Sequence, residues 1–102
     1  MSNFINKIDA LCKRYKFRYD ELGAYIKIKS KYDTWYIENN EDLAEYDIYH
    51  ENTLKLTRKG RVNDNHWHRQ KNKSNKYLKL KLDDVFNYIK RHDKKREKRK
   101  YI

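Results

Sequence analysis

The sequence predicts an α+β fold in which an antiparallel sheet of three to five strands packs against an N-terminal and a C-terminal helix. Apolar residues recur at helical spacing near both ends of the chain, and short segments of alternating apolar and polar residues lie between them. These segments follow one another without a long crossover, so we expect antiparallel pairing. The 102 residues fit one domain, which we expect to span 1–92, with 93–102 as a basic helix extension or tail.

Two helices are expected at the ends of the chain. The first is predicted from an apolar stripe with spacings of three and four, formed by Phe4, Ile5, Ile8, Leu11, Cys12 and Tyr15. The second is predicted to begin at Asp83 and Asp84, because carboxylates stabilise the positive end of a helix. Its buried residues are expected to be Val85, Phe86 and Ile89. We expect this helix to fray into the basic residues 91–100.

The strands are predicted from alternation. Residues 24–29 and 34–38 are expected to form a hairpin around a turn at 30–33. Its core-facing residues are expected to be Ala24, Ile26, Ile28, Trp35 and Ile37. The remaining elements are short. Residues 39–45 are expected to form a loop or a single helical turn, and 47–51 and 54–57 two strands or one bulged strand broken at Asn52. A hairpin tip is expected at 58–61, a strand at 65–70, a polar loop at 71–76, and a strand or extended lead-in at 77–82.

The charge of the chain is strongly asymmetric. The net charge is +11, but residues 1–50 contain 8 Lys and Arg against 9 Asp and Glu, a net charge of −1. Residues 51–102 contain 18 Lys and Arg against 6 Asp and Glu, a net charge of +12. A one-sided field attracts a polyanion and holds it by releasing counterions, whereas a surface that serves only solubility mixes the two signs. The asymmetry therefore predicts a nucleic-acid or ribonucleoprotein partner.

The candidate nucleic-acid-binding residues are the basic side chains of the hairpin tip, the following arm and loop, and the second helix. They are Arg58, Lys59, Arg61, Arg69, Lys71, Lys73, Lys76, Lys90, Arg91, Lys94, Lys95 and Arg96. Basic residues on tips, loops and helix surfaces can reach phosphates without disturbing a core. Exposed tyrosine or tryptophan side chains beside them would add base stacking.

The histidines form the one arrangement that resembles a catalytic or metal site. On a strand, His66 and His68 share one face and Trp67 takes the other, which we expect to be the core face. With His50 from a neighbouring strand they could hold zinc, or act as the acid and base of a metal-independent ribonuclease. The sequence shows no carboxylate partner at a diagnostic spacing. We therefore expect a protein that is not an enzyme and binds no metal or cofactor, and interpret His66 and His68 as solvent-facing.

The other features limit the alternatives. Cys12 is the only cysteine and lies on the apolar stripe of the first helix, so we expect a buried thiol and no internal disulfide. The sequence has no phosphate-binding glycine loop and no nucleophile elbow. No apolar run reaches the length that spans a bilayer, and the first residues do not form a secretory signal. These features predict a soluble, cytoplasmic protein without a membrane partner.

Several segments resemble small uncharacterised proteins carried by phages and other mobile elements of AT-rich bacteria. They are 35–38, 48–50, 66–70 and 85–89, together with Leu82 and His92. The resemblance implies a short accessory protein, a class that includes host-takeover factors and inhibitors of defence systems such as anti-CRISPR proteins. Many such inhibitors imitate DNA with acidic surfaces, and this basic chain departs from that pattern. As an inhibitor, it would engage guide RNA, target nucleic acid or an acidic patch on the effector.

The order of helix, strands and helix is also similar to the double-stranded-RNA-binding fold, which includes small toxin-like ribonucleases with a strand histidine. That family places lysines at the start of its last helix, where this chain has Asp83 and Asp84. The leading hypothesis is a non-enzymatic module that binds nucleic acid or a ribonucleoprotein. The alternatives are an inhibitor of a host or defence enzyme and a histidine-dependent ribonuclease.

Overall fold

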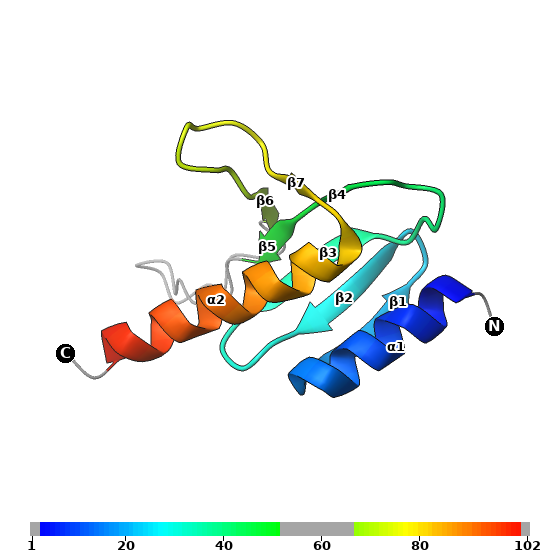
Figure 1. Cartoon of the computed structure of the whole chain (residues 1–102), viewed down its shortest axis with the longest axis horizontal. Helices are drawn as coiled ribbons and strands as arrows, with labels where there is room; N and C mark the ends of the chain where they lie inside the picture. The colour runs from blue at the N-terminus through cyan, green and yellow to red at the C-terminus, as the bar shows by residue number, and fades with distance from the viewer. Residues whose placement is uncertain (1–2, 52–66, 101–102) are drawn as a thin grey trace, which may run out of the picture.

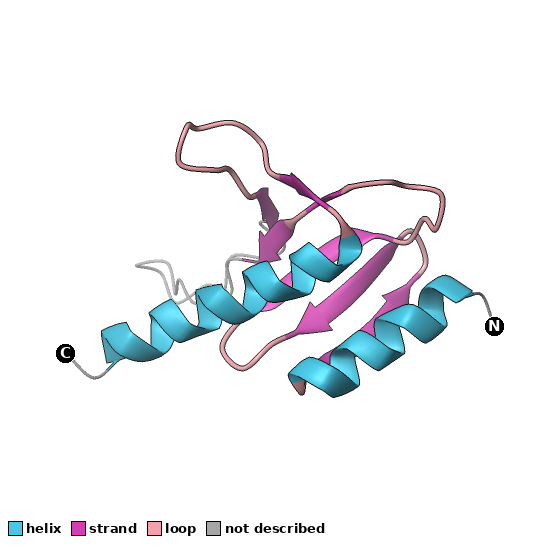
Figure 2. Ribbon diagram, in the orientation of Figure 1, coloured by secondary structure: helices cyan, strands magenta, loops and turns pink. Residues whose placement is uncertain are grey.

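The computed structural model describes residues 3–51 and 67–100 and places two helices on one face of an antiparallel sheet (Figure 1). The helices are α1 (Asn3–Tyr15) and α2 (Leu82–Lys100). The strands are β1 (Arg18–Leu22), β2 (Tyr25–Lys29), β3 (Thr34–Glu38), β4 (Tyr46–Asp47), β5 (Tyr49–Glu51), β6 (Trp67–Arg69) and β7 (Lys79–Leu80). The predicted α+β fold, with a helix at each end of the chain, is confirmed (Figure 2).

The strands form two sheets. The larger sheet has the order β1-β2-β3-β5-β6, and every neighbouring pair in it is antiparallel. The smaller sheet is the pair β4-β7. The chain passes from one sheet to the other at Ile48, which is fully buried. The strand predicted at 47–51 is therefore two strands with different partners.

Strand β1 has no counterpart in the sequence prediction. Its residues are mostly exposed, so it lacks the apolar alternation that marks a half-buried strand. Leu22 pairs with Tyr25, which leaves Gly23 and Ala24 as a two-residue turn, and Gly23 has φ +65° as such turns require. The prediction that Ala24 faces the core was wrong, because this residue belongs to the turn and is exposed.

The core lies between the helices and the sheet. The apolar stripe of α1 is buried from Phe4 to Cys12, and Val85, Phe86 and Ile89 are fully buried on α2, as predicted. From the sheet, alternation turns four residues toward the helices, namely Ile26, Ile28, Trp35 and Ile37, and all four are fully buried.

The opposite face of the sheet has its own aromatic cluster. Trp67 stacks on Tyr36 with ring centroids 3.6 Å apart, and Tyr25 meets Trp67 edge-on at 5.1 Å. The prediction that Trp67 faces the main core was wrong. Because neighbouring strand residues point to opposite faces, His68 lies on the helix side, where it pairs with His50.

Helix α2 continues to Lys100, and the expected fraying from residue 91 was wrong. The reason is that the second half of the helix is held by polar contacts. Asp93 is buried on α2, and Arg96 forms an ion pair with buried Asp33 from the turn between β2 and β3. Residues 93–100 are thus a continuous part of the helix.

Some predicted features lie outside the described residues. They are the strand at 54–57, the tip with Arg58, Lys59 and Arg61, and His66. Within residues 3–51 and 67–100, neither helix combines the length and the apolar character needed to cross a bilayer.

Candidate functional site

The turn between β2 and β3 carries a buried carboxylate. Ser30 closes this turn by hydrogen bonds from its backbone nitrogen (3.0 Å) and its hydroxyl group (3.2 Å) to the carbonyl oxygen of Asp33. The indole nitrogen of Trp35 donates to the Ser30 hydroxyl at 3.1 Å, which fixes the turn to the core. The Asp33 side chain is only 2% exposed and faces α2.

Helix α2 is fastened to this turn by several polar contacts. Asp93 accepts hydrogen bonds from the Ser30 hydroxyl at 2.9 Å and from the backbone nitrogen of Lys31 at 3.0 Å. At the surface, Lys31 Nζ lies 3.4 Å from Glu97 Oε1. These contacts hold α2 in a position where His92 and Arg96, on the same flank of the helix, lie against Asp33.

Three side chains from two elements surround the Asp33 carboxylate. Arg96 Nη1 lies 3.1 Å from Oδ1, His50 Nε2 lies 3.0 Å from the same oxygen, and His92 Nδ1 lies 3.5 Å from Oδ2. Arg96 donates a hydrogen bond to Oδ1. Among the described residues, Asp33 Oδ2, His50 Nε2 and His92 Nδ1 are buried atoms without a hydrogen-bond partner. We call Asp33, His50, His92 and Arg96 the Asp33 cluster.

The imidazoles of this region pack against one another and against Trp35. The His50 ring lies 4.5 Å from the Trp35 ring, 5.0 Å from His68 and 5.4 Å from His92. Burial lowers the pKa of His92 below the ordinary histidine value, and the nearby Asp33 carboxylate opposes that change. Burial likewise lowers the pKa of His68, and His50 adds to the lowering. The neutral form is therefore favoured for His92 and His68, and a neutral imidazole has a free lone pair.

The sequence prediction grouped His50 with His66 and His68, left Asp33 and His92 out of that group, and assigned Arg96 to the nucleic-acid-binding residues. His68 was expected to face solvent and is exposed, whereas His50, its neighbour across the strands, is buried. A usable signal was present on α2, where the buried positions Val85 and Ile89 continue at helical spacing as His92 and Arg96. A polar residue on an apolar helix stripe indicates a buried polar partner.

His92 also lines a basic pocket of about 320 Å³ between α2 and the loop before β7. Its other lining residues are Lys73, Tyr88, Arg91 and Lys95, and none of the described residues that line it is acidic. We call it the α2–loop pocket. The loop is shaped by Asn72, whose side-chain oxygen accepts hydrogen bonds from the backbone nitrogens of Ser74 and Lys76.

A second basic pocket, of about 600 Å³, lies where α1 ends and β1 begins. Its lining residues are Tyr15, Lys16, Phe17, Arg18, Lys29, Ser30 and Lys31. The sequence prediction missed it because residues 1–50 are almost neutral as a whole. Arg18 and Lys29 are direct neighbours across the β1-β2 ladder. Like charges in that position repel each other, which is unfavourable for folding.

The two basic pockets lie on opposite flanks of α2. Lys90 lies over the ring of Tyr15, and Lys31 contacts Glu97, so this flank of the helix faces the second pocket. Arg91 and Lys95 line the α2–loop pocket on the other flank. Basic side chains therefore extend across the helix from one pocket to the other.

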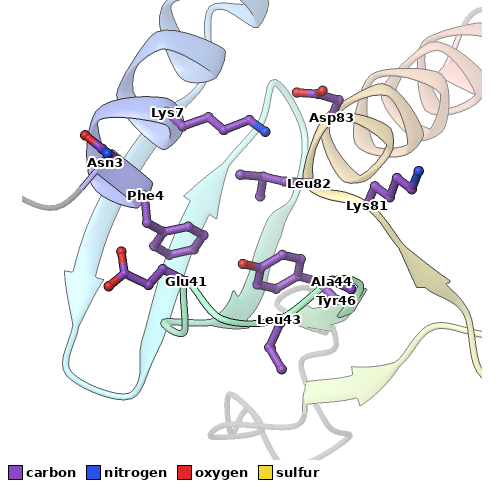
Figure 3. Close-up of a pocket in the computed structure, with 10 residues that line it drawn as sticks. All are labelled: Asn3, Phe4, Lys7, Glu41, Leu43, Ala44, Tyr46, Lys81, Leu82 and Asp83. Carbon is purple, nitrogen blue, oxygen red and sulfur yellow. The ribbon is translucent and has the colours of Figure 1, made fainter.

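A third pocket contrasts with these two. It lies between the start of α1, the loop before β4 and the start of α2 (Figure 3). Its charged lining residues have both signs, with Lys7 and Lys81 against Glu41 and Asp83. Phe4 and Tyr46 are stacked at 5.8 Å and form part of its apolar lining. This mixed lining gives no preference for a polyanion.

The structure separates the described members of the predicted nucleic-acid-binding set into exposed side chains and side chains held in ion pairs. Arg69 Nη2 donates to Asp47 Oδ1 at 2.6 Å, and its guanidinium lies 4.1 Å from the Tyr77 ring centroid. Arg96 is held by Asp33, so these two arginines stabilise the fold. The predicted lysines and arginine that remain exposed are Lys71, Lys73, Lys76, Lys90, Arg91, Lys94 and Lys95.

None of the protein-family models, curated proteins or solved structures compared with this chain matches it. The geometry of the site is therefore the basis for a functional proposal.

Proposed function

We propose that this protein binds nucleic acid through the phosphate backbone, with the α2–loop pocket as the principal contact. The observation that supports the proposal is the convergence of Lys73 from the loop with Arg91 and Lys95 from the helix, with no acidic residue among the described lining residues. Three cations held around one concave site can release several counterions when a phosphodiester chain enters. Tyr88 in the same pocket supplies an aromatic surface.

The surroundings of the pocket support a chain-like ligand rather than a single small anion. The second basic pocket lies on the other flank of α2, and exposed Lys90 and Lys94 lie on the helix between the two. Tyr77 is 53% exposed beside the loop, with Arg69 packed on its ring. Aromatic rings next to a basic track are typical of proteins that bind single strands.

The proposal is tested by fluorescence anisotropy with labelled single-stranded RNA, single-stranded DNA and duplex DNA over a salt series. We expect affinity to fall steeply as salt rises. The triple variant Lys73→Gln, Arg91→Gln, Lys95→Gln should reduce the slope of log K against log salt by about 2 for single strands, since each phosphate contact contributes about 0.7.

The matched control also removes three positive charges, but from the exposed face of α1, with Lys7→Gln, Lys13→Gln and Arg14→Gln. This control should keep most of the affinity and the slope. Equal loss in both variants would show a diffuse effect of net charge, and a weak response that is insensitive to salt would overturn the proposal.

The alternative function is inhibition of a host or defence enzyme. The same basic surface would serve it, because an enzyme that is a ribonucleoprotein also exposes phosphates. A pull-down from nuclease-treated lysate separates the two. Retention of one nuclease-resistant protein partner, together with a weak, salt-insensitive anisotropy signal, would favour the inhibitor. We also propose a cytoplasmic setting, which agrees with the buried free thiol of Cys12.

A further inference from the structure

We propose that Asp33, His50 and His92 form a binding site for a divalent transition-metal ion of the Zn²⁺ type. One nitrogen or oxygen ligand atom from each of the three residues lies within 4.8 Å of the others. The residues come from three separate parts of the chain, namely the β2–β3 turn, β5 and α2. Imidazole and carboxylate are ligands that Zn²⁺ accepts readily.

Two of the distances within the cluster are close to those around a tetrahedral ion. Two ligand atoms that each lie about 2.0–2.1 Å from Zn²⁺ are about 3.3 Å apart when the angle between them is tetrahedral. His50 Nε2 lies 3.0 Å from Asp33 Oδ1, and His92 Nδ1 lies 3.5 Å from Asp33 Oδ2. The three ligand atoms all lie within 4.8 Å of one another, so side-chain rotations would bring them to the separation that a tetrahedral ion requires.

The hydrogen bonding of the cluster points to the same conclusion. His50 Nε2, His92 Nδ1 and Asp33 Oδ2 are buried and have no hydrogen-bond partner among the described residues, although they lie close together. Buried polar atoms are normally satisfied, and three unsatisfied donors or acceptors in one place call for an explanation. A shared cation would satisfy all three lone pairs at once.

Arg96 is the main argument for a closed, purely structural cluster, because its positive charge already balances Asp33. Its hydrogen bond goes to Oδ1 alone. Oδ2 is therefore available to a metal ion. Arg96 on Oδ1 would orient the carboxylate, which is the role that residues hydrogen-bonded to metal ligands commonly have. Three protein ligands leave the fourth tetrahedral position for water or another oxygen ligand.

The test is a titration of the full-length, chelator-treated protein with Co²⁺, which reports four-coordinate binding through its visible absorption bands. We expect one Co²⁺ per chain and displacement by Zn²⁺. We also expect Zn²⁺ at a 100-fold excess over its Kd to raise the thermal unfolding midpoint by about 10 °C or more, because the ion binds only the folded state.

Variants locate the site. His50→Gln and His92→Gln should each weaken Co²⁺ binding by about 100-fold or more. Replacement of a residue that only orients a metal ligand already costs about 10- to 100-fold, so loss of a ligand itself should cost at least as much. Replacement of the partly exposed His92 is the milder change, and circular dichroism checks that the variant is folded. The matched control is His68→Gln, a neighbouring histidine that lies 5.0 Å from the His50 ring but is not a member of the ligand set.

Two outcomes would overturn the proposal. One is a parent protein that shows neither the Co²⁺ bands nor the Zn²⁺-dependent shift of the unfolding midpoint. The other is a loss of binding in His68→Gln as large as that in His92→Gln, which would place the ion elsewhere. Neither result bears on the nucleic-acid proposal, which concerns Lys73, Arg91 and Lys95 of the α2–loop pocket.

Discussion

Replacing Arg96 with methionine tests how the Asp33 cluster contributes to folding. The guanidinium donates to Asp33 Oδ1 at 3.1 Å, and the Asp33 side chain is only 2% exposed. Methionine keeps much of the apolar stem but removes the permanent positive charge. Loss of one partner of a buried ion pair typically costs about 3–5 kcal/mol, because the remaining charge is desolvated and uncompensated.

The lower end of that range applies here. The Arg96 side chain is 36% exposed, so solvent already screens part of its interaction with Asp33. We therefore expect the free energy of unfolding to fall by about 3 kcal/mol, which lowers the urea midpoint by about 2 M if m is about 1.5 kcal/mol/M.

Urea unfolding followed by circular dichroism, with a chelator present, measures this loss. Asp33→Asn removes the buried charge, so Arg96 has no ion pair left to lose in the double variant Asp33→Asn, Arg96→Met. This double variant should therefore be more stable than the sum of the two single losses predicts, with an interaction energy of about 2 kcal/mol. Arg91→Met is the matched control on an exposed part of the same helix and should stay within about 0.5 kcal/mol of the parent. A loss below about 1 kcal/mol in Arg96→Met, or additive single losses, would refute the reasoning.

Three further predictions concern the core and the turns. Phe86→Ala should lower the free energy of unfolding by about 3–5 kcal/mol in the same urea assay, because the ring is fully buried, and a loss below about 1 kcal/mol would contradict the packing. Burial raises the pKa of Cys12 to about 12, so a thiol reagent at pH 8 should label it only as fast as the chain unfolds, and immediate labelling of the folded protein would show that it is accessible. Gly23→Ala should cost about 1–2 kcal/mol through its positive φ alone, since a Cβ there meets nothing within 4 Å. Ala24→Gly is the control for that turn and should change stability less.

The sequence predicted the elements that bury a periodic apolar face. The stripe of α1, the alternation of Ile26 and Ile28, and the buried start of α2 all report directly on burial, so their pattern was sufficient. Strand β1 was missed because it is an edge strand with mostly exposed residues. An edge strand pairs through its backbone and needs no apolar alternation.

The Asp33 cluster could not be predicted for a different reason. Asp33 contacts Arg96 across 63 residues of sequence, and no local pattern reports on a contact of that range. In the sequence Asp33 is an ordinary turn residue and Arg96 is one of many basic residues near the end of the chain. The tertiary structure determines which arginine forms an ion pair with a buried carboxylate and which arginines stay exposed.

The contacts between α2 and the β2–β3 turn also have a consequence for the entropy of the proposed binding to a polyanion. Asp93 and Arg96 fix the second half of the helix, so its exposed lysine side chains are attached to a backbone that is already ordered. Residues four apart on a helix are separated by about 6 Å along its axis, and Lys90, Lys94 and Lys98 share that spacing. A disordered basic tail would lose backbone freedom on meeting a polyanion, whereas this pre-organised row of charges has lost it during folding.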